Sequence, residues 1–519
     1  MKNLISLWLT AALLCMFLCS CGTAVSVTTI TLDDSGITVN GAPASQQKSK
    51  AVYTANDIVY YEQGHDFTYG EGNETDAHSA EEANRHTVVH IQKAGTYRLS
   101  GTLSAGQIAV DLGEDADDKP SDVVTLILDN VNLTCTVAPA IIFYNVYECC
   151  DNDEDTATQT VNTAAAGANI VLADGSQNTV NGSYVAKIYE SYTLNEAGTE
   201  VTDSDKLHKY DGAVYSCMTM NVSGEKKGNG TLTITAQNEG LDSERHLTIN
   251  GGTVNIVSKN DGINTNEDGI SVTTINGGTL NITVGKTAAE GDGIDSNGWL
   301  VINGGTINAF ACGRSMDSGI DSDNGIFLNG GTVVATGNML DRLSNGTQTF
   351  AVFAFADSQP ADTVYTLKNE QGETVVSATP ANTFTQLVIS SSTLKAGTYT
   401  LYRGETALSV ATTNNGGGRP QGGNRPFDNT NEPPFDGNEP PQKPQGDFGE
   451  GPSFGSETPP EKPEGETPPP FNGNEPPQKP EGGFGERPTP PAGITNTDTI
   501  YTTTFTLADG ANYFSVAKS

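Results

Sequence analysis

The tripeptide Asn-Gly-Gly occurs four times at almost even spacing in the middle of this chain. The copies begin at Asn250, Asn276, Asn303 and Asn329, so the intervals are 26, 27 and 26 residues. Each copy follows an apolar residue and precedes threonine and an alternating apolar pattern. Period-2 alternation is typical of strands, and a fixed period of this length is typical of a solenoid, in which stacked repeats build one core together. Paired glycines suit corners that need a positive φ.

Each repeat has room for three short strands, one of which follows a turn of the form acidic-Gly-apolar. Three strands per repeat predict a triangular, parallel β-helix with Val, Ile and Leu stacked inside. A sequence pattern typical of strands begins at His86, and the most regular repeats run from Asp211 to about Asn338. We therefore predict an all-β chain in which residues 86–345 form a three-sheet solenoid.

The flanking segments have different compositions. Residues 21–85 predict a loose lead-in with one or two strands, and residues 346–413 predict an antiparallel β cap over the end of the solenoid. Residues 414–491 are rich in Pro, Gly and Glu and have almost no aliphatic side chains, which predicts a disordered insertion. Residues 492–519 read as terminal strands that return to the cap.

The first residues indicate export. Lys2 precedes a short apolar run, and the sequence Leu18-Cys19-Ser20-Cys21 matches a bacterial lipobox with Cys21 as the lipidated residue. We predict a lipoprotein signal peptide over residues 1–20 and an exported, membrane-anchored protein on the cell surface. An ordinary signal peptide that is cleaved nearby is the alternative.

The chain is strongly acidic, with a formal net charge of −36. This excludes non-specific binding to nucleic acid and leaves the lipid on Cys21 as the expected membrane contact. We expect a monomer. Five cysteines follow Cys21, and Cys135 with Cys149 or Cys150 is a plausible disulfide in an exported protein, although spacing does not fix the connectivity.

The acidic-Gly-apolar turns place carboxyl and amide side chains at equivalent positions of successive repeats. If the turns align, Asp242, Asn264, Asp295 and Asp321 form one outward row at the interstrand spacing of roughly 4.8 Å. Two carboxylates at that distance repel by about 0.9 kcal/mol in water and about 3.5 kcal/mol at an effective dielectric near 20. Residues 228–338 contain twelve acids and four basic residues, so basic side chains of this stretch cannot neutralise the row. All-oxygen ligands favour calcium; the alternative is that Asp and Asn serve as ordinary turn residues.

The order of these motifs resembles a family of secreted bacterial carbohydrate-binding proteins that are right-handed parallel β-helices related to pectate lyases. The resemblance covers roughly His86 to Leu408 and rests on the segments beginning at Val89, Gly95, Gly106, Leu126, Pro139, Asp211 and Gly230 and on the Asn-Gly-Gly-Thr repeats. It implies calcium on the helix face and affinity for plant-type polysaccharides, including acidic ones. The residues that take the metal role by this resemblance are Asp242, Asp261, Asn264, Asp292, Asp295 and Asp321.

Two alternatives to binding without catalysis stay open. Related lyases use calcium and a basic residue that removes a proton, and Lys259, two residues before Asp261, is the candidate base here. A structural surface adhesin is the other alternative. For the glycan itself we predict contacts from Trp299, which should point outward near Asp295, and from Arg314.

Overall fold

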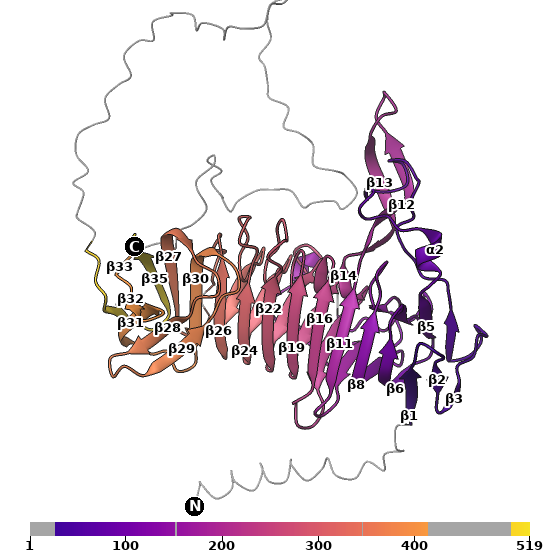
Figure 1. Cartoon of the computed structure of the whole chain (residues 1–519), viewed down its shortest axis with the longest axis horizontal. Helices are drawn as coiled ribbons and strands as arrows, with labels where there is room; N and C mark the ends of the chain where they lie inside the picture. The colour runs from indigo at the N-terminus through magenta and orange to yellow at the C-terminus, as the bar shows by residue number, and fades with distance from the viewer. Residues whose placement is uncertain (1–25, 151–152, 345, 414–499, 519) are drawn as a thin grey trace, which may run out of the picture. The chain divides into compact units, whose positions relative to one another are not determined.

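The structure is a computed structural model that describes residues 26–150, 153–344, 346–413 and 500–518, all of which belong to one compact unit. The predicted signal peptide, the lipidation residue Cys21 and the Pro/Gly-rich segment 414–491 lie outside the described residues. The described part is nearly all β, as predicted (Figure 1). Its helical elements are one turn of α-helix, α2 (Ala80–Ala83), and one 3-10 turn at Glu154–Thr156. No helix among these residues is long and apolar enough to cross a membrane.

The Asn-Gly-Gly corners join two parallel ladders of strands that stack repeat upon repeat (Figure 1). The first ladder contains β6 (Gly95–Leu103), β10 (Ala168–Leu172), β15 (Met220–Gly224) and the four strands before the corners, β18 (Leu247–Ile249), β21 (Val272–Ile275), β23 (Trp299–Ile302) and β25 (Gly325–Leu328). The second ladder contains β11 (Gln177–Gly182), β16 (Thr231–Ala236), β19 (Thr253–Ser258), β22 (Thr279–Val284), β24 (Thr306–Phe310) and β26 (Thr332–Gly337). The long strand β8 (Val124–Thr134) belongs to both ladders, and so does β6, which pairs with β8 on both sides of a register shift.

The corners themselves form as the sequence predicts. The amide of Asn276 donates to the side-chain oxygen of Asn250 at 2.9 Å, and Asn303 and Asn329 continue this chain at 3.0 Å each. The second glycine of each corner has a positive φ, for example 86° at Gly252. Inside, aliphatic residues of successive strands stack in register and are fully buried: Leu232, Val254, Leu280, Ile307 and Val333. Each such side chain contributes about 1.5–3 kcal/mol through removal from water.

A seven-stranded sheet carries the third strand of the repeats. It contains β4 (Val52–Ala55), β5 (Thr87–Ile91), β7 (Gly106–Val110), β9 (Ile141–Phe143), β14 (Gly212–Ser216), β17 (Glu239–Ser243) and β20 (Ile263–Thr265). All neighbours pair in parallel except β4, which lies antiparallel to β5. The next repeat continues past β20 as a single bridge between Ile263 and Ile294.

The lead-in 21–85 is more ordered in its described part than expected. It contains β1 (Val27–Leu32), β2 (Thr38–Val39), β3 (Ala42–Pro43), β4 and α2, whose N-terminal amide at Glu82 is capped by Ser79. Strand β1 pairs in parallel with β6, and β4 covers the edge of β5. Open sheet edges attract other chains, so covering them explains why this segment packs.

Antiparallel strands follow the last repeat. They are β27 (Phe350–Gln359), β28 (Tyr365–Asn369), β29 (Thr374–Ala378), β30 (Phe384–Ser391), β31 (Gly397–Arg403), β32 (Thr406–Ala407) and β33 (Val410–Thr412). Strand β30 lies antiparallel to both β26 and β27. The C-terminal strands β34 (Phe505–Leu507) and β35 (Ala511–Val516) return to this region, where β34 pairs with β31 and β35 with β27. Aromatic residues including Phe353, Phe384 and Phe514 form a separate core there.

Two insertions leave the repeats. The second forms a long antiparallel hairpin of β12 (Val185–Leu194) and β13 (Val201–Tyr210) (Figure 1). The first contains Cys149 and Cys150, whose sulfur atoms lie 3.2 Å apart. The predicted pairing of Cys135 with either of them is wrong, because all five cysteines of the described residues are free thiols. Cys135 directly follows β8, and its thiol is buried in the core, which raises its pKa to about 12.

Candidate functional site: the acidic row

The acidic-Gly-apolar turns align along one face of the seven-stranded sheet. Asp242 of β17 pairs in register with Asn264 of β20. The amide of Asp295 donates to the carbonyl of Ile263 at 2.8 Å, and the amide of Asp321 donates to Ile294 at 2.7 Å, so both occupy the equivalent position in later repeats. We call Asp242, Asn264, Asp295 and Asp321 the acidic row.

A second line of acids lies three residues before the row. The amide of Gly240 donates to the carbonyl of Asp261 at 3.1 Å, that of Gly262 to Asp292 at 3.0 Å, and that of Gly293 to Ser318 at 3.0 Å. Glu239, Asp261, Asp292 and Ser318 are therefore equivalent positions, and the last repeat lacks the acid. The carboxylate of Asp261 accepts from the amide of Asp292 at 2.6 Å, and that of Asp292 accepts from the amide of Ser318 at 2.5 Å.

The start of the row is buried, contrary to the expectation that it faces outward. Asp242 is 0% exposed and Glu239 is 5% exposed. The amide of Asn264 donates to Glu239 at 3.3 Å and to the Asn266 oxygen at 2.9 Å, while Asn266 donates to Asp242 at 2.8 Å. These amides satisfy one oxygen of each carboxyl. In this cluster Glu239 Oε2, Asp242 Oδ2 and Asn264 Oδ1 are buried and accept no hydrogen bond from an amide or hydroxyl of the described residues, while the Glu239 and Asp242 carboxyls contact each other and can share a proton.

Burial is the main cause of the altered acidity at this end of the row. It raises the pKa of Glu239 and of Asp242 well above the ordinary values, and neighbouring carboxyls raise both further. Those neighbours include Asp211 in each case. A buried carboxyl without a charge partner favours its neutral form. A cation that contacted these three buried oxygens would reverse this preference.

The later acids of the row and of the second line are equally crowded: Asp292, Asp295 and Asp321 are half-buried, and Asp261 is buried. Burial first, and neighbouring carboxyls second, raise the pKa of Asp261 to about 7, of Asp292 to about 10, of Asp295 to about 6 and of Asp321 to about 8, although backbone hydrogen bonds oppose the shift at each of them. Asp341, which lies beyond the last repeat, adds a further carboxyl beside Asp321. Perturbed carboxyls gathered at one surface are typical of functional sites.

One basic residue from outside residues 228–338 acts on the start of the row, and a second pairs with Glu244 beside it, which corrects the expectation that basic side chains cannot neutralise the row. Lys209 Nζ lies 2.7 Å from Asp211, and its charge also interacts with Glu239 and Asp242. Lys206 Nζ lies 2.8 Å from Glu244. Both come from strand β13 of the hairpin. Residues 228–338, whose acidic and basic residues were compared above, do not include this insertion.

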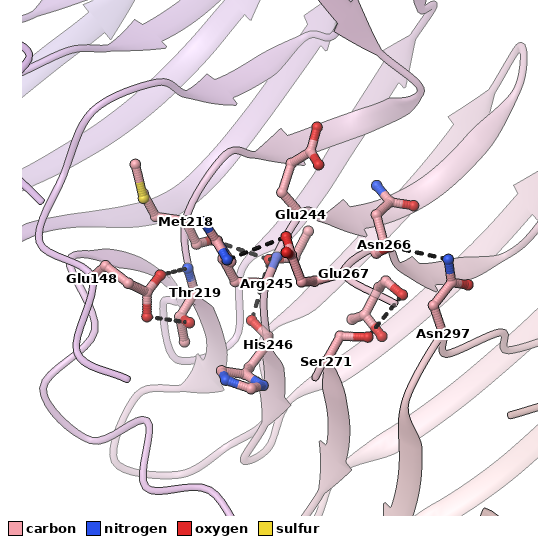
Figure 2. A network of polar contacts seen from close by, with 12 residues as sticks. Glu148, Met218, Thr219, Glu244, Arg245, His246, Asn266, Glu267, Ser271 and Asn297 are labelled. Carbon is pink, nitrogen blue, oxygen red and sulfur yellow. Dashed lines mark hydrogen bonds and ion pairs between the residues drawn. The ribbon is translucent and has the colours of Figure 1, made fainter. Parts of the chain in front are cut away.

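A polar network holds the neighbouring turns in place. Figure 2 shows Arg245 reaching Glu267, at 3.2 Å, and the Asn297 amide reaching the backbone oxygen of Asn266, at 3.0 Å. On the other side, both oxygens of Glu148 accept from Thr219, at 2.8 and 2.7 Å (Figure 2). These contacts fix the loops that carry the row, and they do so without using the oxygens of the row itself.

The donor set of the row fits a hard cation. Carboxylate and amide oxygens are the ligands that calcium prefers, and one oxygen each of Glu239, Asp242 and Asn264 is buried without an amide or hydroxyl donor. Among the described His, Cys, Asp and Glu residues, three ligand atoms lie mutually within 4.8 Å at Glu148, Cys149 and Cys150, and no three carboxyls of the acidic row do so. Asn264 and backbone carbonyls would therefore have to complete any site in the row.

The predicted base and glycan residues come from different elements. Lys259 is exposed and lines a different pocket, together with Thr136, Tyr184 and Gln237, so the suggested pairing with Asp261 is not formed. Trp299 is half-buried and lies on β23, in the ladder before the corners, while Leu300 and Ile302 beside it point inward as expected. Arg314 is exposed in a loop.

Comparison with known proteins gives the family. A solved polysaccharide lyase-like protein from C. thermocellum, a gadolinium derivative, is 20% identical and matches 61% of this chain and 92% of its own, with a TM-score of 0.33. That score is too low to bear on fold or function. A carbohydrate-binding domain-containing protein from Acetivibrio thermocellus is 30% identical over 169 residues, which are 32% of this chain and 44% of that relative. The profile of the family described as carbohydrate-binding domain-containing protein matches residues 85–413, more than half of the chain. The chain belongs to this family of carbohydrate-binding domain-containing proteins.

Proposed function

We propose that this protein binds polysaccharide through a calcium-loaded, right-handed parallel β-helix, and that the glycans include acidic ones of the plant type. In this proposal the two ladders and the seven-stranded sheet are the three faces of the helix. Export as a lipoprotein anchored through Cys21 and action as a monomer are parts of the same proposal. Family membership supports the carbohydrate ligand.

The observation that carries the calcium proposal is the set of buried oxygens without an amide or hydroxyl donor at Glu239, Asp242 and Asn264. Leaving buried polar atoms unpaired costs about 1–3 kcal/mol each. Lys209 supplies one positive charge at 2.7 Å from Asp211, which leaves Glu239 and Asp242 to be neutralised otherwise. Calcium would supply a divalent charge and a preference for oxygen ligands. These three residues would hold the buried ion.

The half-buried end of the row is where a glycan would meet the protein. Asp295 and Asp321 are partly exposed, unlike Asp242. A chain of charge −36 repels a polyuronate, so carboxylates of the protein and of the sugar need a cation between them. Asp295 and Asp321 would orient that contact. The lyase alternative would need Lys259 beside the row, and this residue lines the pocket that contains Thr136, Tyr184 and Gln237.

The test is binding of polygalacturonate to the purified protein with calcium and with EDTA. We expect binding that vanishes with chelator and weakens about tenfold or more in Asp295→Asn and in Asp321→Asn. Asp118→Asn, an exposed acid far from the row in sequence, and Lys259→Ala are the matched controls and should bind as the wild type does. Equal binding in EDTA by a protein whose circular dichroism is unchanged would overturn the calcium bridge. Calcium-dependent release of unsaturated sugar, lost in Lys259→Ala, would establish the lyase instead.

A further inference from the structure

The row that carries the acids continues along the same sheet in the opposite direction. Strand register places Tyr215 beside Asp242, and then, strand by strand, Ile142, Ala109, His90 and Tyr53. These are all members of one line of side chains on the seven-stranded sheet. The side chains along this line therefore change from carboxyl and amide groups on β17 and β20 to aromatic rings on β4 and β5.

A pocket of about 330 Å³ lies at this aromatic end. Five rings line it: Tyr53, His90, Tyr144, His208 and Tyr210. Tyr53 and His90 are stacked, with ring centres 4.4 Å apart and planes 7° apart. Tyr144 meets Tyr210 edge-on at 5.5 Å and 77°. The line of side chains on the sheet contributes Ala109 to this pocket, and its side chain ends at the β-carbon.

The rings come from distant segments. Tyr53 and His90 belong to β4 and β5, Tyr144 directly follows β9, and His208 and Tyr210 end the hairpin strand β13. The hairpin is thus one wall of the pocket, and the lead-in is the other. Neither segment shows the Asn-Gly-Gly repeat, which is why the repeat pattern did not indicate this site.

Polar groups of the pocket are held in fixed orientations. Gln107, 2% exposed, donates to the carbonyl of Pro139 at 2.8 Å. Asn145 donates to Asp111 at 2.9 Å, and the His208 Nδ1 lies 2.7 Å from the Tyr210 hydroxyl. A few oriented polar groups among aromatic rings are the usual composition of a small-ligand site, and 330 Å³ is near the lower end of the roughly 300–1,000 Å³ such sites span. A pyranose ring matches this chemistry, because its C–H face packs on aromatic rings while its hydroxyls hydrogen-bond at the rim.

The charges of the pocket select against uronic acids. Asp57 is paired with His90 at 2.7 Å and with Lys48 at 3.1 Å, so its charge is compensated. Asp111, in contrast, accepts hydrogen bonds from Asn145 and from the amide of Gly113. A sugar carboxylate beside Asp111 would be repelled, whereas a neutral sugar hydroxyl can donate to it.

We propose that this aromatic pocket is a subsite for a neutral pyranose unit of a polysaccharide chain and works without calcium. The inference rests on the proposed polysaccharide binding and adds a second, chemically different contact on the same sheet. The acidic row would bind charged residues of a glycan, and the aromatic pocket would bind neutral ones.

The experiment is isothermal titration of the full chain, in EDTA, with neutral hexasaccharides of the β-1,4-glucan, xylan and mannan types and with hexagalacturonate. Circular dichroism checks that the protein stays folded. We expect at least one neutral oligosaccharide to bind and hexagalacturonate not to bind. Tyr144→Ala and His208→Ala should each weaken the neutral ligand about tenfold or more, and Tyr144→Phe, which keeps the ring, should retain binding. Tyr192→Ala, an exposed tyrosine of the same hairpin that is 46% exposed, is the matched control.

The results separate the two proposals. Calcium-dependent binding of polygalacturonate without any binding of neutral oligosaccharides would overturn the subsite and leave the proposed function intact. Neutral binding through Tyr144, without a calcium effect on polygalacturonate, would support the subsite and overturn the calcium bridge. Neutral binding that is lost in Trp299→Ala and kept in Tyr144→Ala and His208→Ala would move the sugar contact to β23 and overturn the pocket.

Discussion

At the scale of single residues, Asn264 decides the charge of the buried end of the acidic row. Its neighbours in the row and in the preceding line are Asp242 and Glu239, and it supplies the amide that hydrogen-bonds Glu239 at 3.3 Å. Replacing Asn264 by Asp removes this donor and adds a third carboxyl. In EDTA the free energy of unfolding should fall by about 1–3 kcal/mol, the cost of leaving the buried Glu239 oxygen without its donor.

The same Asn264→Asp variant should bind calcium more tightly, because the added carboxylate is a calcium ligand. Urea unfolding in EDTA and in millimolar calcium measures both effects. The expected result is a variant that is less stable than the wild type without metal and equally or more stable with it. If both proteins lost the same stability in the two buffers, no cation would be held at Asn264.

His246 is a second residue with a measurable signature. It is 3% exposed, and its Nδ1 accepts from the amide of Val272 at 3.0 Å. Burial, helped by the adjacent Arg245, lowers its pKa from 6.5 to about 4. His246 therefore binds a proton below about pH 6.5 in the unfolded chain but only below about pH 4 in the folded chain. The free energy of unfolding falls as pH decreases between these two values.

Below about pH 4, where the loss is complete, it amounts to roughly 3 kcal/mol, since each pKa unit corresponds to about 1.4 kcal/mol. His246→Asn keeps an acceptor for the Val272 amide and does not titrate there. We expect the stability difference between wild type and His246→Asn to shrink as pH falls from 6.5 to 4. Urea unfolding at several pH values checks it, and a constant difference would contradict it.

At the scale of elements, the hairpin β12–β13 brings positive charge to a part of the row that the repeats leave uncompensated. Lys209→Met removes the ion pair with Asp211 and the charge that also acts on Glu239 and Asp242. We expect a melting temperature roughly 2–4 °C lower in EDTA, with a smaller loss in calcium. Lys187→Met, on the same hairpin but paired with Glu71 at 3.0 Å, is the control and should not depend on calcium. An identical calcium response in the two variants would show that Lys209 does not act on the row.

The hairpin also marks what the sequence could not reveal. The corner spacing predicted the register of the ladders and the alignment of Asp242 with Asn264, because each repeat places the same turn at the same height. It did not predict that Asp242 is buried or that Lys209 acts on it, since Lys209 comes from an insertion with no repeat. The ring pairs Tyr53–His90 and Tyr144–Tyr210 were missed for the same reason. Contacts between non-repeating segments depend on tertiary structure alone.

At the scale of the whole molecule, the acidity of the row makes stability depend on pH and on metal together. Asp261, Asp292, Asp295 and Asp321 all have a pKa that burial raises above the ordinary 3.8, to about 7, 10, 6 and 8. Between pH 4 and these values the folded protein holds protons that the unfolded chain has lost. The free energy of unfolding of the metal-free protein should therefore fall as pH rises across this range.

Calcium should reverse that slope, because its binding needs deprotonated carboxylates and becomes stronger as pH rises. We expect the melting temperature in EDTA to decrease from pH 5 to pH 8, and the melting temperature in excess calcium to stay level or increase. At pH 8 the two should differ by several degrees, and at pH 5 they should converge. Differential scanning calorimetry, with metal analysis of the protein as purified, provides the measurement. Magnesium at the same concentration is the control for ionic strength and should protect less, since it gives up its water ligands reluctantly. Identical melting curves in EDTA and calcium at pH 8 would mean that protons and Lys209 alone neutralise the row. That result would contradict the calcium-dependent part of the proposed function.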